Sequence, residues 1–237
     1  MFYRSLYMGI FNMAKRELAF STFLKLLELN EPQKATTLRG FLRGGGFNYW
    51  RPLQMLAPDI VSGKLALGDI ASRVGALAKG HQRKYNEAAL DRLLKWVLGR
   101  NLQYRRAPEK VVRDFGESGL KVRIEPEVAF VMDGRHYLMH IWATNSPSLS
   151  DETLSMGLHF FRQSMKPTLP DANYLLFDTI KNRVFSEVDL LQHASSWLDA
   201  QQLILSLLWD KINAPEDGGG ARPQGEDWDN EQPNYQH

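Results

Sequence analysis

The sequence contains no cysteine among its 237 residues. That absence excludes disulfide bonds, thiolate metal ligands and cysteine nucleophiles, and it is compatible with a reducing cytoplasm. Apolar runs are short, and none approaches the roughly 18 consecutive apolar residues of a membrane span. The opening segment has neither a clean hydrophobic region nor a small-residue cleavage site, so we expect no signal peptide. We therefore expect a cytoplasmic protein that does not contact a membrane.

The sequence also lacks the short motifs of several enzyme classes. It has no Gly-x-Ser-x-Gly nucleophile elbow and no His-Glu-x-x-His zinc motif. The glycines at 44–46 are not followed by Lys-Ser/Thr and do not follow an expected strand, which excludes the common phosphate-binding loops. The histidines show no metal-binding spacing and stand at His81, His136, His140, His159, His193 and His237.

Charge is divided unevenly along the chain. Residues 1–110 hold 19 Lys and Arg against 8 Asp and Glu, whereas residues 111–237 hold 10 against 19. The net charge of +2 therefore hides a basic first half and an acidic second half. This segregation favours a polyanion-facing surface in the first half, although solvated helices rich in Lys and Arg would give the same counts.

Composition and periodicity predict four segments. We expect a disordered extension at 1–12, with Met13 as a candidate start, and a basic helical region at 13–100. An α/β core follows at 101–213, and an acidic, Gly- and Pro-rich tail at 214–237 is expected to be disordered. Apolar spacing in the basic region predicts helices at 18–29, 33–42, 53–55 (cut short by Pro58), 67–77 and 85–99.

Arginine and aromatic residues alternate around the three glycines at 44–46. Guanidinium groups bind phosphate and aromatic rings stack on bases, so this composition is typical of a nucleic-acid surface. The other interpretation is that the aromatic rings pack in a helical core while the cations stay solvated. The candidate nucleic-acid-binding residues, with DNA favoured over RNA, are Arg39, Arg43, Arg51, Lys79, Arg83 and Lys84.

The strongest local signal lies at 120–144. Apolar residues recur at every second position on both sides of Asp133-Gly134, which indicates a two-stranded antiparallel hairpin with a tight turn. Beyond it we expect a short helix before 120, a helix at 152–165 capped near Ser150, two strands within 172–187 and a helix at 190–212. The fold class is α/β (α+β): a helical N-terminal region, then a mixed β-sheet flanked by helices.

An acidic motif stands at the entry of the hairpin, where Glu125, Pro126 and Glu127 precede the alternating run. Thirteen residues after Glu127, the return strand carries His140-Ile141-Trp142. With the order of elements, this region (about 85–213) resembles the core of the PD-(D/E)XK, or restriction-endonuclease-like, superfamily. The resemblance implies an acidic metal ligand at Glu127 and a Mg²⁺ or Mn²⁺ cofactor if the site is active; otherwise the cofactor is unknown.

The motif departs from that family at two positions. His140 and Trp142 stand where the resemblance implies a second acid and a lysine, and imidazole is a poor ligand for Mg²⁺. The candidate catalytic residues are Glu127, His140 and Glu125. His140 is a candidate general base, a ligand for a softer metal, or a packing residue; Glu125 and Glu127 are a candidate carboxylate pair on one strand face, or two solvated acids.

The sequence therefore predicts a nucleic-acid-binding protein with a degenerate nuclease-like core, as part of a DNA-processing or defence assembly. One alternative is an active metal-dependent nuclease with a rearranged site, which would hydrolyse phosphodiesters. The other is a protein-interaction scaffold whose partners are proteins.

Overall fold

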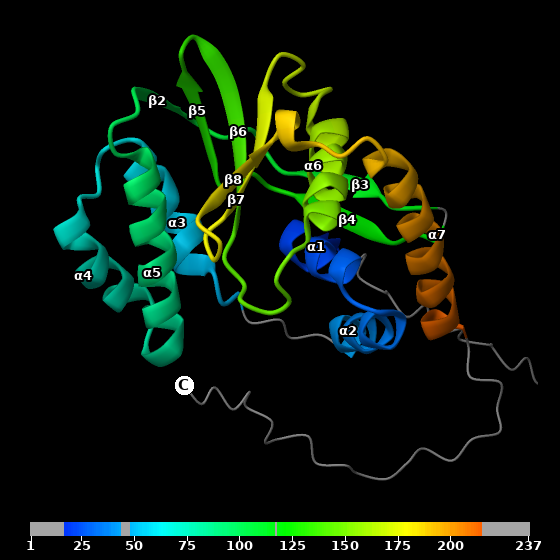
Figure 1. Ribbon diagram of the computed structural model, residues 1–237. Helices are drawn as coiled ribbons and strands as arrows, with labels where there is room; N and C mark the ends of the chain where they lie inside the picture. Colours follow the sequence, from blue (N-terminus) through cyan, green and yellow to red (C-terminus); the bar gives the residue numbers. More distant parts are fainter. Residues whose placement is uncertain (1–16, 44–47, 117, 215–237) are drawn as a thin grey trace, which may run out of the picture.

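The computed structural model describes residues 17–43, 48–116 and 118–214. The predicted extension at 1–12, the glycines at 44–46 and the tail from 215 onward lie outside the described residues. A five-stranded mixed sheet forms the centre of the molecule and has helices on both faces (Figure 1). The expectation of a mixed α/β fold is confirmed.

The central sheet has the strand order β2-β5-β6-β7-β8, and only the β6-β7 pair is parallel. Its strands are β2 (Leu102–Arg105), β5 (Val128–Met132), β6 (Arg135–Trp142), β7 (Asn173–Asp178) and β8 (Arg183–Ser186). The predicted hairpin is confirmed as β5-β6. Its turn residues, Asp133 and Gly134, have φ values of 51° and 74°, as a two-residue turn of this kind requires.

Alternate residues of β6 enter two separate cores. Leu138 and Trp142 face one side, and Met139 and Ile141 face the other. The second side is covered by helices α3 (Arg51–Val61), α4 (Leu67–Leu77) and α5 (Gly80–Val97), which lie together on the left of Figure 1. Three of the helices predicted from apolar spacing in the first half thus form one core with this face of the sheet.

The first side is covered by α1 (Phe20–Glu28), α6 (Asp151–Met165) and a second, three-stranded sheet. That sheet has the order β1-β4-β3, with β1 (Glu17–Ala19) parallel to β4 (Lys121–Ile124) and β3 (Val111–Asp114) antiparallel to it. Helix α2 (Glu31–Arg43) follows α1, and the 3-10 turn η1 (Glu187–Asp189) precedes the last helix, α7 (Ala194–Asn213).

Four sequence-based expectations need correction. The N-terminal region is not helical throughout, because Glu17–Ala19 pairs with β4. The short helix expected before 120 is instead β3, which also pairs with β4. As a result, residues 121–124 belong to the second sheet and not to the hairpin sheet. Pro58 does not end α3, which continues to Val61 because Leu56, Ala57 and Ile60 bury an apolar face.

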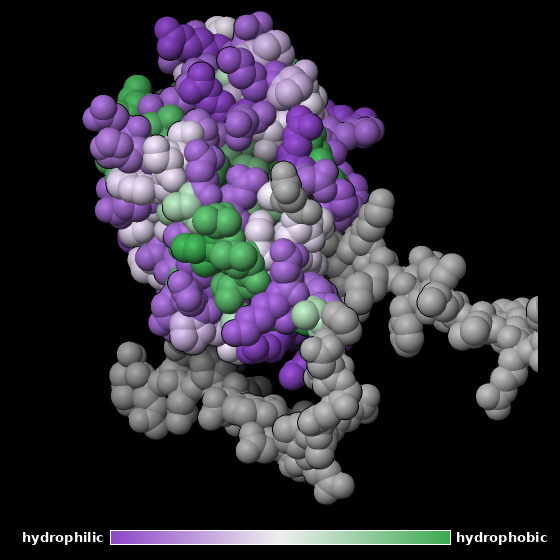
Figure 2. All heavy atoms as spheres, turned by 90° about the vertical axis from the view of Figure 1, so that its right-hand side faces the viewer, coloured by the Kyte–Doolittle hydropathy of each residue, from purple (hydrophilic) through white to green (hydrophobic). Residues whose placement is uncertain are grey.

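Helix α7 packs on α6 and α2, so the helix expected at 190–212 covers the outer side of α6 and not the sheet itself. Its outer surface is partly apolar: Leu203 and Leu207, one turn apart, are 63% and 61% exposed. Figure 2 shows an apolar patch on this side of the molecule. None of the helices in the described ranges has the length and apolar character needed to cross a bilayer.

Candidate functional site

A cleft of about 740 Å³ opens between α1, α2, α3, β4 and the C-terminal end of β6. Segments far apart in the sequence form its walls, and aromatic and neutral polar side chains dominate the lining. The lining residues that matter for chemistry are Glu17, Ser21, Thr22, Trp50, Gln54, Arg123 and Glu127.

Glu127 lies directly before β5, where its side chain reaches the floor of the cleft and is 4% exposed. Its Oε2 accepts a hydrogen bond of 2.9 Å from the backbone N–H of Ile141, and its Oε1 accepts a long one of 3.5 Å from Nε2 of Gln54. A buried carboxylate needs such donors, because an unpartnered charge is costly to remove from water. The prediction that Glu127 belongs to a site is consistent with this position.

His140 lies opposite Glu127 on β6 and is 3% exposed. Its Nδ1 is 2.8 Å from Oε2 of Glu127, although the oxygen lies off the direction of the ring N–H and the contact is not a well-directed hydrogen bond. Its Nε2 is 3.1 Å from Oγ of Ser21, and Phe20 packs edge-on against the ring at 4.8 Å. The imidazole therefore bridges a carboxylate and a hydroxyl.

Ser21 is a site residue that sequence reasoning missed. It is the second residue of α1 and lines the cleft, 119 positions before His140. No motif surrounds it, and the only local signal was the polar pair Ser21-Thr22 within an otherwise apolar run. A second contact fixes the other end of α1, where Oε2 of Glu28 accepts hydrogen bonds from N and Oγ of Ser150 at 2.8 and 2.9 Å.

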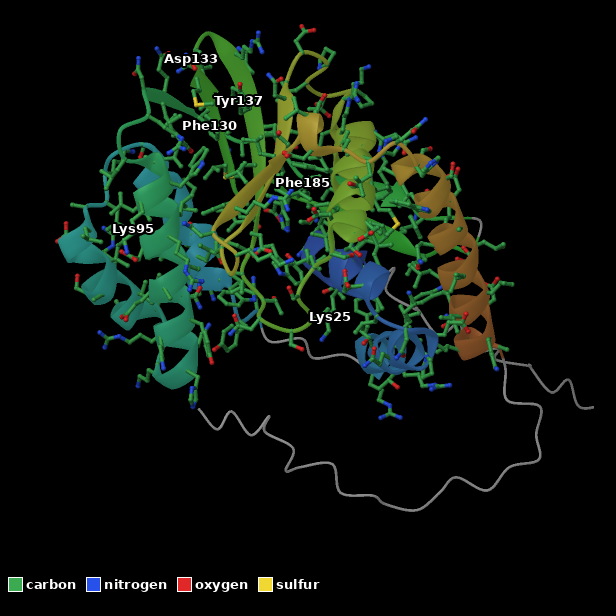
Figure 3. All side chains as sticks on the ribbon, viewed as in Figure 1. Lys25, Lys95, Phe130, Asp133, Tyr137 and Phe185 are labelled. Carbon is green, nitrogen blue, oxygen red and sulfur yellow. The ribbon has the colours of Figure 1, made fainter. Side chains whose placement is uncertain are left out.

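The structure does not bring Glu125 into this site. Glu125 follows β4, its side chain is 63% exposed, and its nearest cation is Arg123 at 3.9 Å. Glu125 and Glu127 do not share a strand face, because residues 125–127 connect β4 to β5 and belong to neither strand. Asp133, the other acid that a rearranged site might recruit, lies at the far tip of the hairpin (Figure 3). Trp142 is 2% exposed and fills core volume.

The six predicted nucleic-acid-binding cations are all exposed. Arg39 is on α2, which lines the cleft, and Arg51 begins α3 next to Trp50 in the opposite wall. Lys79, Arg83 and Lys84 surround the first turn of α5, and Arg83 is paired with Glu87 at 2.6 Å.

Hydrogen bonds connect the backbone before α3 to the first turns of α5. The carbonyl oxygen of Tyr49 accepts bonds of 3.0 Å from both Gln82 and Asn86, so the start of α3 is held against the first turns of α5. Lys84 lines a smaller hollow that shares Ala143 with the cleft. The cations of α2 and α3 thus lie on helices that line the cleft, and the start of α5 borders the neighbouring hollow.

The aromatic residues on either side of the glycines at 44–46 were expected either to contact nucleic acid or to pack in a core. Phe41 packs against the core on the α1 side, with its ring 6.3 Å from that of Trp209. Tyr49 and Trp50 line the cleft, and their ring centroids are 5.0 Å apart. Nε1 of Trp50 donates a hydrogen bond of 3.2 Å to Oγ1 of Thr144. Phe41 also lines the cleft, so all three rings reach it, and Phe41 additionally packs on the core.

Across the part of the chain that the structure describes, no three His, Asp or Glu side chains converge as a metal site would require. Glu127, the predicted metal ligand, has His140 as its ionisable neighbour. Comparison of the chain with family models, curated proteins and solved structures gives no match.

Proposed function

We propose that the protein binds nucleic acid on the cationic rim of the cleft, without efficient cleavage. The observation that carries the proposal is the position of six exposed cations at and beside one cleft. Three are on α2 and α3, which line the cleft, and three are at the start of α5, which is hydrogen-bonded to Tyr49 before α3 and borders the neighbouring hollow. Such cations bind phosphate oxygens. The rings of Tyr49 and Trp50 line the cleft, where an unstacked base would stack on them.

The strand order supports a restriction-endonuclease-like core. With the β3-β4 insertion set aside, α5, β2, β5, β6, α6 and β7 follow one another as helix, three antiparallel strands, helix and parallel strand. In that arrangement Glu127 and His140 stand side by side on neighbouring strands, as the resemblance implies for the two acidic positions. The family assignment is part of the proposal.

An active Mg²⁺ or Mn²⁺ nuclease fits the side chains less well. A hard divalent ion prefers several oxygen ligands, whereas the site offers one carboxylate and an imidazole. The scaffold alternative draws on the apolar surface of α7, where Leu203 and Leu207 are exposed. Contiguous apolar surface of this kind is typical of protein contacts.

The test is a salt titration of DNA binding with a charge-reversed variant. Each neutralised phosphate contributes about −0.9 to the slope of log affinity against log salt, so Arg43→Glu with Arg51→Glu should reduce the slope by about 2. The matched control is Lys64→Glu with Lys211→Glu, which changes the net charge equally at exposed lysines outside the rim. The control should keep the wild-type slope.

Three results would contradict the proposal. Equal losses in the two double variants would mean that only net charge matters, and undetectable binding of duplex and single-stranded DNA and RNA by the wild type would favour the scaffold. Robust Mg²⁺-dependent cleavage that Glu127→Ala abolishes would favour the active nuclease.

A further inference from the structure

We propose that Ser21, His140 and Glu127 form a nucleophile, base and acid relay that hydrolyses an uncharged carboxylic ester bound in the cleft. This inference does not rest on nucleic-acid binding at the rim. It rests on the two contacts of His140: Nε2 to Oγ of Ser21 at 3.1 Å, and Nδ1 to Oε2 of Glu127 at 2.8 Å.

The order of the contacts matches the roles that acyl transfer requires. A serine hydroxyl is a weak nucleophile until an adjacent base accepts its proton, and a carboxylate on the far side of the imidazole orients the ring and stabilises its charged form. This constellation is recognised by geometry and not by sequence position, so the absence of a Gly-x-Ser-x-Gly elbow does not exclude it. The Nδ1 contact with Glu127 is short but poorly aligned, and catalytic hydrogen bonds of this kind often become aligned only when substrate is bound.

The hydroxyl is accessible from the cleft while the base is not. Ser21 lines the cleft, whereas His140 is 3% exposed and meets the cleft only through Ser21 and Glu127. A base excluded from bulk water keeps its proton transfer directed to one partner, and the surrounding low dielectric strengthens its contact with the carboxylate.

The start of α1 also offers donors for the oxyanion of the tetrahedral intermediate. The first-turn N–H groups of a helix have no acceptor within the helix, and Ala19, at the N-cap, provides no side-chain cap. Ser21 and Thr22 belong to this turn. Backbone N–H groups therefore lie beside the nucleophile, as in established oxyanion holes.

The charges of the cleft indicate an uncharged substrate. Its ionisable lining groups are two carboxylates, Glu17 and Glu127, and one guanidinium, Arg123, which the β1-β4 register places beside Ala19. A substrate anion inside the cleft would meet no surplus of positive charge, because the six exposed cations are not among its lining residues. The aromatic rings of Tyr49 and Trp50 instead suit an apolar acyl or alcohol group.

The reaction balances without a cofactor. Oγ of Ser21 attacks the ester carbonyl carbon while Nε2 of His140 takes the hydroxyl proton, and the bond to the alkoxy oxygen then breaks as Nε2 returns the proton to it. Water, deprotonated by the same nitrogen, attacks the acyl-serine and restores Ser21. Ester and water give carboxylic acid and alcohol.

The first test is labelling and turnover of the full chain. A fluorophosphonate probe should modify Ser21, located by mass spectrometry, and p-nitrophenyl butyrate should give a burst of p-nitrophenol stoichiometric with protein. Ser21→Ala and His140→Asn should each lower kcat/KM at least about 100-fold. Ser72→Ala, at an exposed position of α4 outside the cleft, should change kcat/KM by less than about threefold and keep the label.

The second test uses the absence of cysteine. Ser21→Cys introduces the one thiol of the chain, and a thiol beside the imidazole is activated as a thiolate. Its alkylation by iodoacetamide near pH 6 should be at least about tenfold faster than that of Thr22→Cys, and His140→Asn should remove the difference. This readout does not need turnover, and it reports whether the imidazole beside position 21 stabilises a thiolate there.

Equal alkylation profiles of the two cysteine variants, or fluorophosphonate labelling that persists in Ser21→Ala, would overturn the inference. Failure of DNA binding would not affect it, because the three relay residues are not among the six exposed cations. The relay proposal and the nucleic-acid-binding proposal can therefore be disproved independently of each other.

Discussion

Lys34 is buried in the first turns of α2, with its Nζ 2.5 Å from the carbonyl oxygen of Leu29. Burial lowers the pKa of this amine below its usual 10.5, and the nearby carboxylates of Glu31 and Glu28 offset part of the change. The folded state therefore binds fewer protons at this site than the unfolded chain, and the stability contribution of Lys34 rises with pH until both states are neutral.

We expect the wild type to gain stability relative to Lys34→Met as the pH is raised through the window just below 10.5. Urea unfolding of the two proteins across that range measures the difference. Parallel curves would mean that the amine is solvated in the folded protein.

At the scale of single residues, the sequence identified the two members of the site that lie on one hairpin. Glu127 and His140 are opposite each other because an antiparallel register follows from the position of the Asp133-Gly134 turn. Ser21 could not be predicted in this way, because its approach to His140 depends on tertiary packing across 119 positions.

Among the elements, α1 and α6 approach closely at Gly157. A side chain there would collide with the Leu24 side chain of α1 and touch Leu176 of β7, so glycine is what allows the two helices to pack. Overpacking of a core contact typically costs about 1–3 kcal/mol. We expect Gly157→Ala to lower the free energy of unfolding by about this amount, as measured by urea denaturation.

Gly68 provides the matched control within α4, because its Cβ position is open. Gly68→Ala should stabilise the protein by up to about 1 kcal/mol, since alanine restricts the unfolded chain and favours the helix. A stabilising effect at Gly157 as well would mean that α1 and α6 do not pack as described.

The elements predicted from sequence were those with a local sequence signal, such as helical periodicity or a turn dipeptide. Residues 67–77 form the expected helix, and the hairpin turn occurs where Asp-Gly predicted it. The strands β1 and β3 were missed because their three and four residues are defined by pairing with β4 and carry little pattern of their own. Helix α3 was predicted too short because burial of its apolar face outweighs the effect of Pro58.

For the whole molecule, the two cores share one sheet. Successive residues of β5, β6 and β7 enter opposite cores, so neither core can come apart without disturbing the strands that complete the other. We therefore expect a single cooperative unfolding transition.

Leu93 of α5 and Leu154 of α6 are fully buried on opposite sides of the sheet. Truncation to alanine at either position should cost about 2–5 kcal/mol and shift the fluorescence and far-ultraviolet circular dichroism transitions together. Two separated transitions in either variant would show that the layers unfold independently.

The parallel pairing of β1 with β4 also has a consequence for synthesis on the ribosome. Glu17 finds its strand partner at Lys121, about 100 residues later, and at about 5–20 residues per second that interval lasts roughly 5–20 s. Throughout it, the apolar residues of α1 have neither β4 nor α6 to cover them. The nascent chain therefore exposes the apolar residues of 20–28 for several seconds, and we expect chaperones that act at the exit tunnel to bind it during that time.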